Sequence, residues 1–296
     1  MLSHTWALTA SRIRLAMRNR AFLFFSLIMP IAFLFIYAGI FGRGNRQAVP
    51  YLLSEVLALT VMGSFWGLSV QLVTFREQGI LRRFRVTPVG ASAMLASSLL
   101  SNYFLTLPTV VIEFFLSRWV FHMAGLGNLT SIFVLVTLGT VSFASLGLIV
   151  ASVTNTMQET QIINQIIWFL FLFISGATIP FPILPSIVQA VAVFLPATYL
   201  VSGLQRAMID RTAVLDLGMY MASLVGCALI AFLVAAQLFR WDPEAKAPRR
   251  AKLWATAAVV PFLLLGVWET FNGDLRAHAM KDLNSIREPY SLERTR

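Results

Sequence analysis

Seven long apolar runs divide this chain of 296 residues and set the main limit on its fold. They lie at approximately 21–41, 52–75, 92–116, 129–153, 161–179, 215–239 and 253–271. Each is close to the ~20 apolar residues that an α-helix needs to cross a hydrocarbon core about 30 Å thick. Charged residues make up only 12% of the chain, against about 25% in a soluble domain. The sequence therefore predicts an all-α polytopic membrane protein.

Residues 1–20 precede the first run and predict an amphipathic helix that lies on the membrane surface. One helical face carries Leu2, Trp6, Ala10, Ile13 and Met17. Arg12 and Arg14 flank this face, and their apolar stems allow the charged heads to snorkel toward water. A cleaved signal peptide is the alternative, but the following apolar run is about twice the length of a signal-peptide core and no small-residue cleavage site follows it.

The basic residues cluster at the ends of the apolar runs, and their distribution predicts the orientation of the chain. With the N-terminus inside, the cytoplasmic segments hold Arg12, Arg14, Arg18, Arg20, Arg76, Arg82, Arg83, Arg85, Arg240, Lys246, Arg249, Arg250 and Lys252. The short external loops hold only Arg43, Arg46, Arg118, Arg206 and Arg211. The positive-inside rule then places the N-terminus in the cytoplasm and the mixed-charge tail 272–296 outside a cell (inner) membrane. The net charge of +10 thus reflects topology and lipid headgroups, and we expect no nucleic-acid partner.

A charged amphipathic segment, 75–93, lies between the second and third runs. Ile80, Leu81 and Phe84 gather on one side of a helical wheel, while arginines occupy the rest until Pro88 stops the helix. This pattern predicts a short helix on the cytoplasmic surface. A basic juxtamembrane loop, kept only by the positive-inside rule, is the alternative.

The region 161–209 is too long for one span, and charge argues against two. A second full span would turn the basic segment 240–252 outward, whereas one span followed by a re-entrant hairpin keeps it inside. Four prolines break helices here: Pro180, Pro182, Pro185 and Pro196. Irregular backbone at membrane depth must be buried in protein or line a cavity. A plain external loop is the alternative.

Two separated motifs resemble the type-2 ATP-binding-cassette (ABC) permease family. The first is the cytoplasmic coupling-helix pattern, formed by Glu77, Gly79, Leu81, Arg82, Arg83, Thr87 and Pro88. The second is the Pro-rich external hairpin, formed by Ser175, Gly176, Pro180, Pro185, Pro196, Tyr199, Gln205 and Arg206. Ile80, where the family usually has Thr, and Ala197, where it has a larger apolar residue, depart from the patterns. The resemblance covers about 1–242.

The resemblance implies a six-span permease domain over 21–242 with a re-entrant hairpin between spans five and six. The run 253–271 is then a seventh, additional span. It also implies a second permease chain, identical or different, and a separate cytoplasmic ATPase subunit. The ATPase would dock on Glu77, Gly79, Ile80, Leu81, Arg82, Arg83, Phe84, Thr87 and Pro88, with the apolar side chains inserted into its surface. Pro180, Pro185, Pro196 and Tyr199 would form an outer gate for a lipophilic or lipid-linked substrate.

The sequence lacks the motifs of an enzyme. No G-x-x-x-x-G-K-[ST] loop is present to hold ATP phosphates, so we expect ATP and Mg on the partner ATPase and no cofactor on this chain. His4, His122 and His278 are far apart, and the single Cys227 lies in an apolar run as an inert thiol. We therefore expect neither an intramembrane hydrolase nor a metal site.

Two carboxylates within the runs are possible pathway charges. Glu55 and Glu113 fall in the outer halves of their predicted spans, so snorkelling to the external interface is the simpler interpretation. An ion-coupled secondary transporter acting without an ATPase is the main alternative function, and it would need broken helices in matching halves and central ionisable residues. A membrane scaffold that transports nothing is a third possibility.

Polar and small residues within the runs predict close helix contacts. Gln158, Gln161 and Gln165 share a helical face, where amides commonly bond between helices. Glu159 is expected to be an interfacial or helix-start charge. Gly63 and Gly67 form a G-x-x-x-G pattern that serves either a dimer contact or packing within the chain.

Overall fold

The computed structural model describes residues 2–41, 48–85, 90–123, 125–239, 241, 263 and 266–269, and within these ranges the regular structure is helical throughout. The helices are α1 (Leu2–Arg18), α2 (Arg20–Ile36), the π-helix η1 (Tyr37–Phe41), α3 (Val49–Met62), α4 (Ser64–Glu77), α5 (Ile80–Arg85), α6 (Ala91–Trp119), α7 (Leu129–Val153), α8 (Met157–Ile174), η2 (Phe181–Ile183), α9 (Ser186–Ala192), α10 (Pro196–Met208), η3 (Val214–Leu217) and α11 (Gly218–Leu238). The predicted all-α class is confirmed for the described residues.

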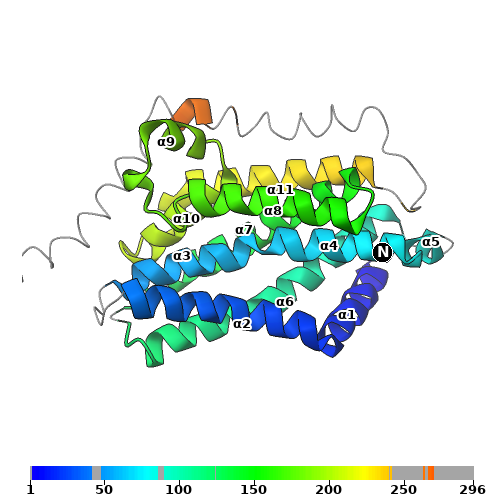
Figure 1. The fold of residues 1–296 in the computed structure, drawn as a ribbon, viewed down its shortest axis with the longest axis horizontal. Helices are drawn as coiled ribbons and strands as arrows, with labels where there is room; N and C mark the ends of the chain where they lie inside the picture. Colours follow the sequence, from blue (N-terminus) through cyan, green and yellow to red (C-terminus); the bar gives the residue numbers. More distant parts are fainter. Residues whose placement is uncertain are drawn as a thin grey trace, which may run out of the picture.

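Among the described helices, four are long and apolar enough to cross a membrane: Val49–Glu77, Ala91–Trp119, Leu129–Val153 and Val214–Leu238. They coincide with the second, third, fourth and sixth predicted runs. The first run forms α2 and η1, of which Ser26–Ile40 is a shorter apolar helix. The fifth run lies in α8, whose first turns are polar. Figure 1 shows the long helices gathered along one common direction, with α1 lying obliquely at one end.

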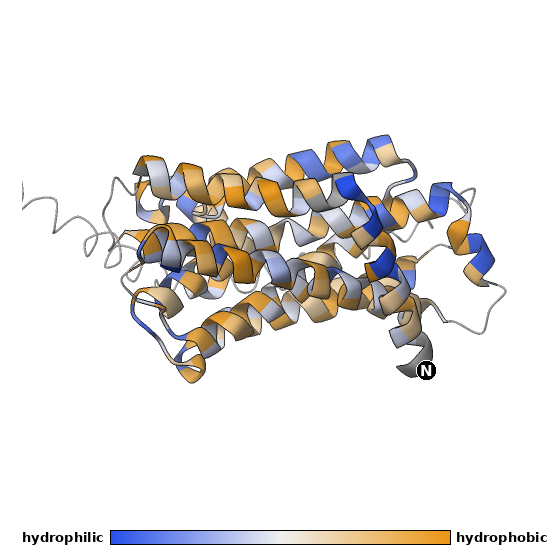
Figure 2. Ribbon diagram, turned by 90° about the horizontal axis from the view of Figure 1, so that it is seen from below, coloured by the Kyte–Doolittle hydropathy of each residue, from blue (hydrophilic) through white to orange (hydrophobic). Residues whose placement is uncertain are grey.

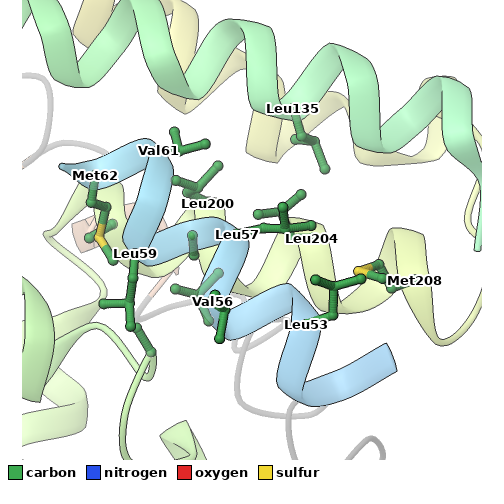
Figure 3. Close-up of a cluster of buried hydrophobic side chains, with 14 of the residues drawn as sticks. Leu53, Val56, Leu57, Leu59, Val61, Met62, Leu135, Leu200, Leu204 and Met208 are labelled. Atoms are coloured by element: carbon green, nitrogen blue, oxygen red, sulfur yellow. The ribbon is translucent and has the colours of Figure 1, made fainter. Parts of the chain in front are cut away.

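The core of the bundle is the contact of α3 with α10 and α7. Leu53, Val56 and Leu57 of α3 face Leu200 and Leu204 of α10, and these side chains are fully buried (Figure 3). Twelve of the thirteen residues of α10 are buried, although it is flanked by breaks on both sides. Close van der Waals packing against α3 and α7 therefore fixes the position of α10.

Close backbone approach makes α7 the central helix. A Cβ atom added at Gly147 would come within 2.3 Å of the carbonyl oxygen of Phe65 in α4. A Cβ at Gly139 would come within 2.8 Å of both Leu200 and Val61. Only glycine fits at position 147, because the atoms in the way belong to the α4 backbone, which packs directly on α7. At position 139 a larger residue would displace the side chains of Leu200 and Val61.

Prolines interrupt the helical structure after α8, as predicted. Pro180 and Pro185 occupy the positions just before η2 and α9. Pro196 is the first residue of α10, where a missing N–H costs no helical hydrogen bond. The pair α9 and α10 is bent by 94°, a geometry that fits a broken span or a re-entrant loop. The hydroxyl of Tyr199 donates to the carbonyl oxygen of Val193 at 2.9 Å and holds this bend.

Most of the predicted seventh span and of the tail 272–296 lies outside the described residues. The short described segment 266–269 is helical and lies beside α9 (Figure 1). Gly266 packs on the ring of Phe194, since a Cβ there would come within 2.1 Å of Phe194 Cδ1. Glu269 is also buried. This segment therefore contacts the chain where α9 turns into α10.

Candidate coupling site

One end of the bundle carries most of the hydrophilic residues along the long helices. Figure 2 shows them concentrated toward the end where the N-terminus lies, while the middle of the long helices is hydrophobic. This polar end is formed by α1, the C-terminus of α4, α5, and the turn between α7 and α8 (Figure 1). It contains the residues that the sequence singled out as a coupling segment.

Gly79 makes the sharp turn from α4 into α5. Its φ of +68° lies in the left-handed region that glycine adopts without strain, and its N–H donates to the carbonyl oxygen of Arg76 at 3.0 Å. The turn separates α5 from α4 as a short helix of its own, as predicted. Arg82 and Arg83 are exposed on it.

The apolar side of α5 faces the chain itself. Leu81 is only 1% exposed and packs in a buried cluster with Leu72 and Met94, and Phe84 is partly buried against the same cluster. The expectation that Leu81 inserts into an ATPase surface is therefore wrong, because the bundle already covers it. Ile80 remains half-buried. Thr87 and Pro88 lie outside the described residues.

Arg76, at the end of α4, caps the C-terminus of α7. Its Nη1 donates to the carbonyl oxygen of Ala151 at 2.8 Å, and its Nη2 donates to that of Thr154 at 2.6 Å. The last carbonyls of a helix have no partner within it and carry the negative end of its dipole. A buried guanidinium, 3% exposed, supplies both the donors and the compensating charge.

The adjacent Glu77 fixes the start of α8. Its Oε1 accepts from the backbone N–H of Met157 at 2.8 Å. Thr156 caps the same helix by accepting from the N–H of Glu159 at 3.2 Å, and Glu159 Oε2 accepts from the N–H of Asn155 at 2.7 Å. These bonds resemble a capping box and confirm Glu159 as a helix-start charge. Arg76 and Glu77 together fasten the base of α5 to both sides of the α7–α8 turn; we call this pair the strut.

Arg12 is buried, so the prediction that it snorkels to water is wrong. Its Nη1 donates to Ser98 Oγ at 2.6 Å and its Nη2 contacts Met94 Sδ at 3.2 Å, both in α6. Its guanidinium carbon also lies 5.3 Å from the centre of the Phe75 ring. Burial lowers the pKa of Arg12 to about 10, which still leaves it charged at neutral pH. Arg12 thus anchors α1 to α6 beside the strut, while Trp6 and Met17 on the predicted membrane face stay exposed.

The polar residues of α8 divide between two roles. Asn164 is buried, and its Nδ2 donates to Ser69 Oγ of α4 at 2.7 Å, as expected for an interhelical amide. Gln158, Gln161 and Gln165, the predicted amide stripe, are exposed on the surface of the chain instead.

Glu55 and Glu113 are buried at the bundle interior, so the predicted snorkelling is wrong for both. Glu55 in α3 is 3% exposed and Glu113 in α6 is fully buried. Glu113 Oε1 accepts from Thr60 Oγ1 at 2.6 Å. The helices that cover these carboxyl groups leave the side chains no route to the interface.

The described residues contain no group of three His, Cys, Asp or Glu side chains that could hold a metal ion. Cys227 is buried. Sequence reasoning missed the roles of Arg12, which it placed at the membrane surface, and of Arg76, which it named only among the inner basic residues. Their partners are a serine, a thioether and main-chain carbonyls, which carry no signal of their own in a sequence.

The described helical bundle, with its four to five candidate spans, indicates a multi-pass membrane protein. Residues 3–209 match the sequence profile of the ABC-2 type transporter family, whose members are membrane subunits that work with an ABC ATPase. This match covers more than half of the chain, so the chain belongs to the ABC-2 type transporter family.

Three bacterial permeases are similar in sequence. The chain is 24% identical over 200 residues to the putative transport permease YvfS of Bacillus subtilis, which covers 63% of this chain and 78% of YvfS. It is 24% identical over 182 residues to the linearmycin resistance permease protein LnrN of B. subtilis, 62% of this chain and 47% of LnrN. It is also 24% identical over 152 residues to the probable multidrug ABC transporter permease YbhS of Escherichia coli, 50% of this chain and 40% of YbhS. The chain thus spans about half or less of the two latter proteins.

Proposed function

We propose that this chain is the translocating half of an ATP-driven exporter for a lipophilic or lipid-linked substrate. Two permease chains would enclose the pathway, and two ATPase subunits would dock at the polar end and bind the ATP and Mg. The names of LnrN and YbhS refer to linearmycin resistance and to multidrug transport. A lipophilic cargo fits a pathway lined by apolar helices. The observation that carries the proposal is the strut beneath α5.

The strut gives a docked ATPase a direct mechanical route into the membrane domain. A load on α5 passes through the Gly79 turn to Arg76 and Glu77, and from there into the end of α7 and the start of α8. Charge-assisted hydrogen bonds are short and strong, so this connection resists bending. Helix α8 would then move with α5 as a unit when the ATPase closes.

One face of α8 exposes amide side chains, and contact of these amides with lipid hydrocarbon is unfavourable. Gln165 lies eight residues into the helix, about 12 Å along it at 1.5 Å per residue, and is exposed together with Gln161. An amide without a hydrogen-bond partner in an apolar medium costs several kcal/mol, roughly 2–7. We therefore place this face toward water or a second copy of the chain, with exposed Phe169 and Phe173 continuing it.

At the other end, we propose that the bent α9–α10 pair is a re-entrant hairpin that closes the pathway, in a six-span core with one added span. Pro180, Pro185 and Pro196 set its breaks, and the Tyr199 hydrogen bond keeps it bent.

Cysteine labelling tests the orientation of the chain in the membrane. In a Cys227→Ser background, cysteines at 45 and 280 should react with an impermeant thiol reagent in intact cells, and one at 246 should not. Labelling at 246 would overturn the N-inside, seven-span arrangement.

The docking test uses the exposed arginines of α5, because Leu81 and Phe84 serve the chain's own packing. Reversing Arg82 and Arg83 together to Glu should reduce copurification of the ATPase and abolish substrate-stimulated hydrolysis, while protein level stays normal. Arg211→Glu, an exposed reversal near the opposite end, is the matched control. Full ATPase recovery with the double variant would reject α5 as the docking site.

An ion-coupled secondary transporter is the second candidate function, and the burial of Glu55 and Glu113 favours it. Copurification decides between the two functions. A tagged chain that is isolated without any ATPase, and still transports in response to an ion gradient, would favour the secondary transporter.

A further inference from the structure

The joint between α9 and α10, residues 193–195, is held by two hydroxyl groups from the first turn of α10. Thr198 Oγ1 donates to the carbonyl oxygen of Ala192 at 2.7 Å, and the Tyr199 hydroxyl donates to that of Val193 at 2.9 Å. Both acceptors lie where α9 ends. These two bonds fix the angle at which α9 leaves α10.

Helix α9 itself lies at the edge of the described bundle. Its Gln189 Nε2 donates to the carbonyl oxygen of Leu184 at 2.8 Å, which ties α9 to η2 as one short unit. Among the described helices, α8 makes the main contact with α9. Ile187 is 77% exposed and Val191 is 46% exposed. An element with few packed contacts opens locally at low cost, so the joint is a place where α9 can turn relative to α10.

The segment 266–269 covers this joint with one face. Gly266 and Glu269 are three residues apart, so they share a helical face, and both are buried, whereas the two residues between them are exposed. A Cβ atom at Gly266 would come within 2.1–2.5 Å of three ring atoms of Phe194. The Phe194 ring therefore lies directly on the backbone of the segment. The charge of Glu269 also acts on the hydroxyl of Tyr199, one of the two groups that hold the joint.

We propose that segment 266–269 is a latch on the α9–α10 joint. It holds α9 in its bent position, and α9 turns about residues 193–195 only after Gly266 leaves the Phe194 ring. The inference concerns control of the proposed re-entrant hairpin, and its role in export rests on the proposed function. The latch itself is a contact within one chain and needs no ATPase.

The first test is a disulfide across the contact, in the full chain with Cys227→Ser. A Cβ at Gly266 would lie 2.5 Å from Phe194 Cγ, so the two Cβ atoms are at most about 4 Å apart, within the range of a disulfide. Phe194→Cys with Gly266→Cys should therefore crosslink on oxidation in lipid nanodiscs, read by mass spectrometry. Phe194→Cys with Trp268→Cys is the matched control, and it should not crosslink because Trp268 is on the exposed side. Absence of the first crosslink, or equal yields of both, would overturn the latch.

The second test is hydrogen exchange at the joint, in the same nanodiscs. The N–H groups of Phe194 and Leu195 donate to carbonyl oxygens at the end of α9, at 3.1 and 2.9 Å. Gly266→Leu pushes the segment off the Phe194 ring and should speed exchange of these two amides about tenfold, because an aromatic contact that holds the joint is lost. Val267→Leu, a change at the exposed neighbour, should leave their exchange unchanged. Wild-type exchange in α7 shows that the bundle has folded.

Unchanged exchange at the joint in a folded Gly266→Leu chain would overturn the proposal. If that variant does not fold, the crosslinked pair decides: the joint should exchange more slowly in its oxidised form than in its reduced form, and equal rates overturn the latch. The role in export is tested separately with the ATPase present. Oxidation of the pair should stop ATP-driven transport and reduction should restore it, whereas continued transport by the crosslinked chain would show that release is not required. Because hydrogen exchange needs no ATPase, the latch and the exporter can fail independently.

Discussion

Removal of the Arg76 guanidinium is the sharpest test of the strut. Arg76→Ala deletes two hydrogen bonds from a charged donor, to the carbonyl oxygens of Ala151 and Thr154. Such bonds contribute about 1.5–3 kcal/mol each, so the sum lies at about 3–6 kcal/mol. Because water can enter the space left at this end of the bundle, we expect the lower figure, about 3 kcal/mol, or more than a hundredfold in the unfolding equilibrium.

The assay is reversible unfolding of the purified chain in mixed detergent micelles, followed by circular dichroism. Arg76→Lys keeps the charge but cannot bond to both carbonyls with a fixed fork, so it should recover about half of the loss. Arg83→Ala removes an exposed arginine of α5 and should stay within about 0.5 kcal/mol of the wild type. If Arg76→Ala were as stable as Arg83→Ala, Arg76 would not be fastening the α7–α8 turn.

Two further predictions concern the packing and capping of the helices. Gly147→Ala should prevent α7 from packing on Phe65, because the new Cβ would lie 2.3 Å from that carbonyl oxygen. Gly226→Ala in α11 meets nothing within 4 Å and should be neutral or slightly stabilising; equal melting temperatures of the two variants would contradict this. Thr156→Ala removes the N-cap of α8 and should lower the free energy of unfolding by about 1 kcal/mol, measured in the same micelles, whereas Thr156→Ser should be silent.

The sequence determined the features that depend on local chemistry. Apolar length placed four of the spans within a few residues, because crossing a hydrocarbon core requires about 20 apolar residues in a row. Prolines at 180, 185 and 196 determined where the helices after α8 break, because proline cannot donate in a helix interior. The spacing of Ile80, Leu81 and Phe84 among the arginines likewise predicted α5 as a short amphipathic helix, whereas the break at Gly79 was not predicted.

Only the tertiary structure decided which side chains meet. Arg12 finds Ser98 across 86 residues, and Arg76 finds Ala151 across 75, so neither pairing can be inferred from spacing along one helix. Leu81 turned inward for the same reason, since the neighbours that cover it come from α4 and α6.

The rotation of each helix about its own axis decided whether the carboxylates within the spans are buried or exposed. A position near the outer end of a span allows Glu113 to reach water only if that face of α6 is uncovered, and α3 covers it through Thr60. Hydropathy along the sequence predicts where a span begins and ends, and so the depth of a residue in it. It does not predict toward which neighbouring helix that residue faces. That orientation follows from close packing of glycines and hydroxyls between helices, which arises only when the bundle assembles.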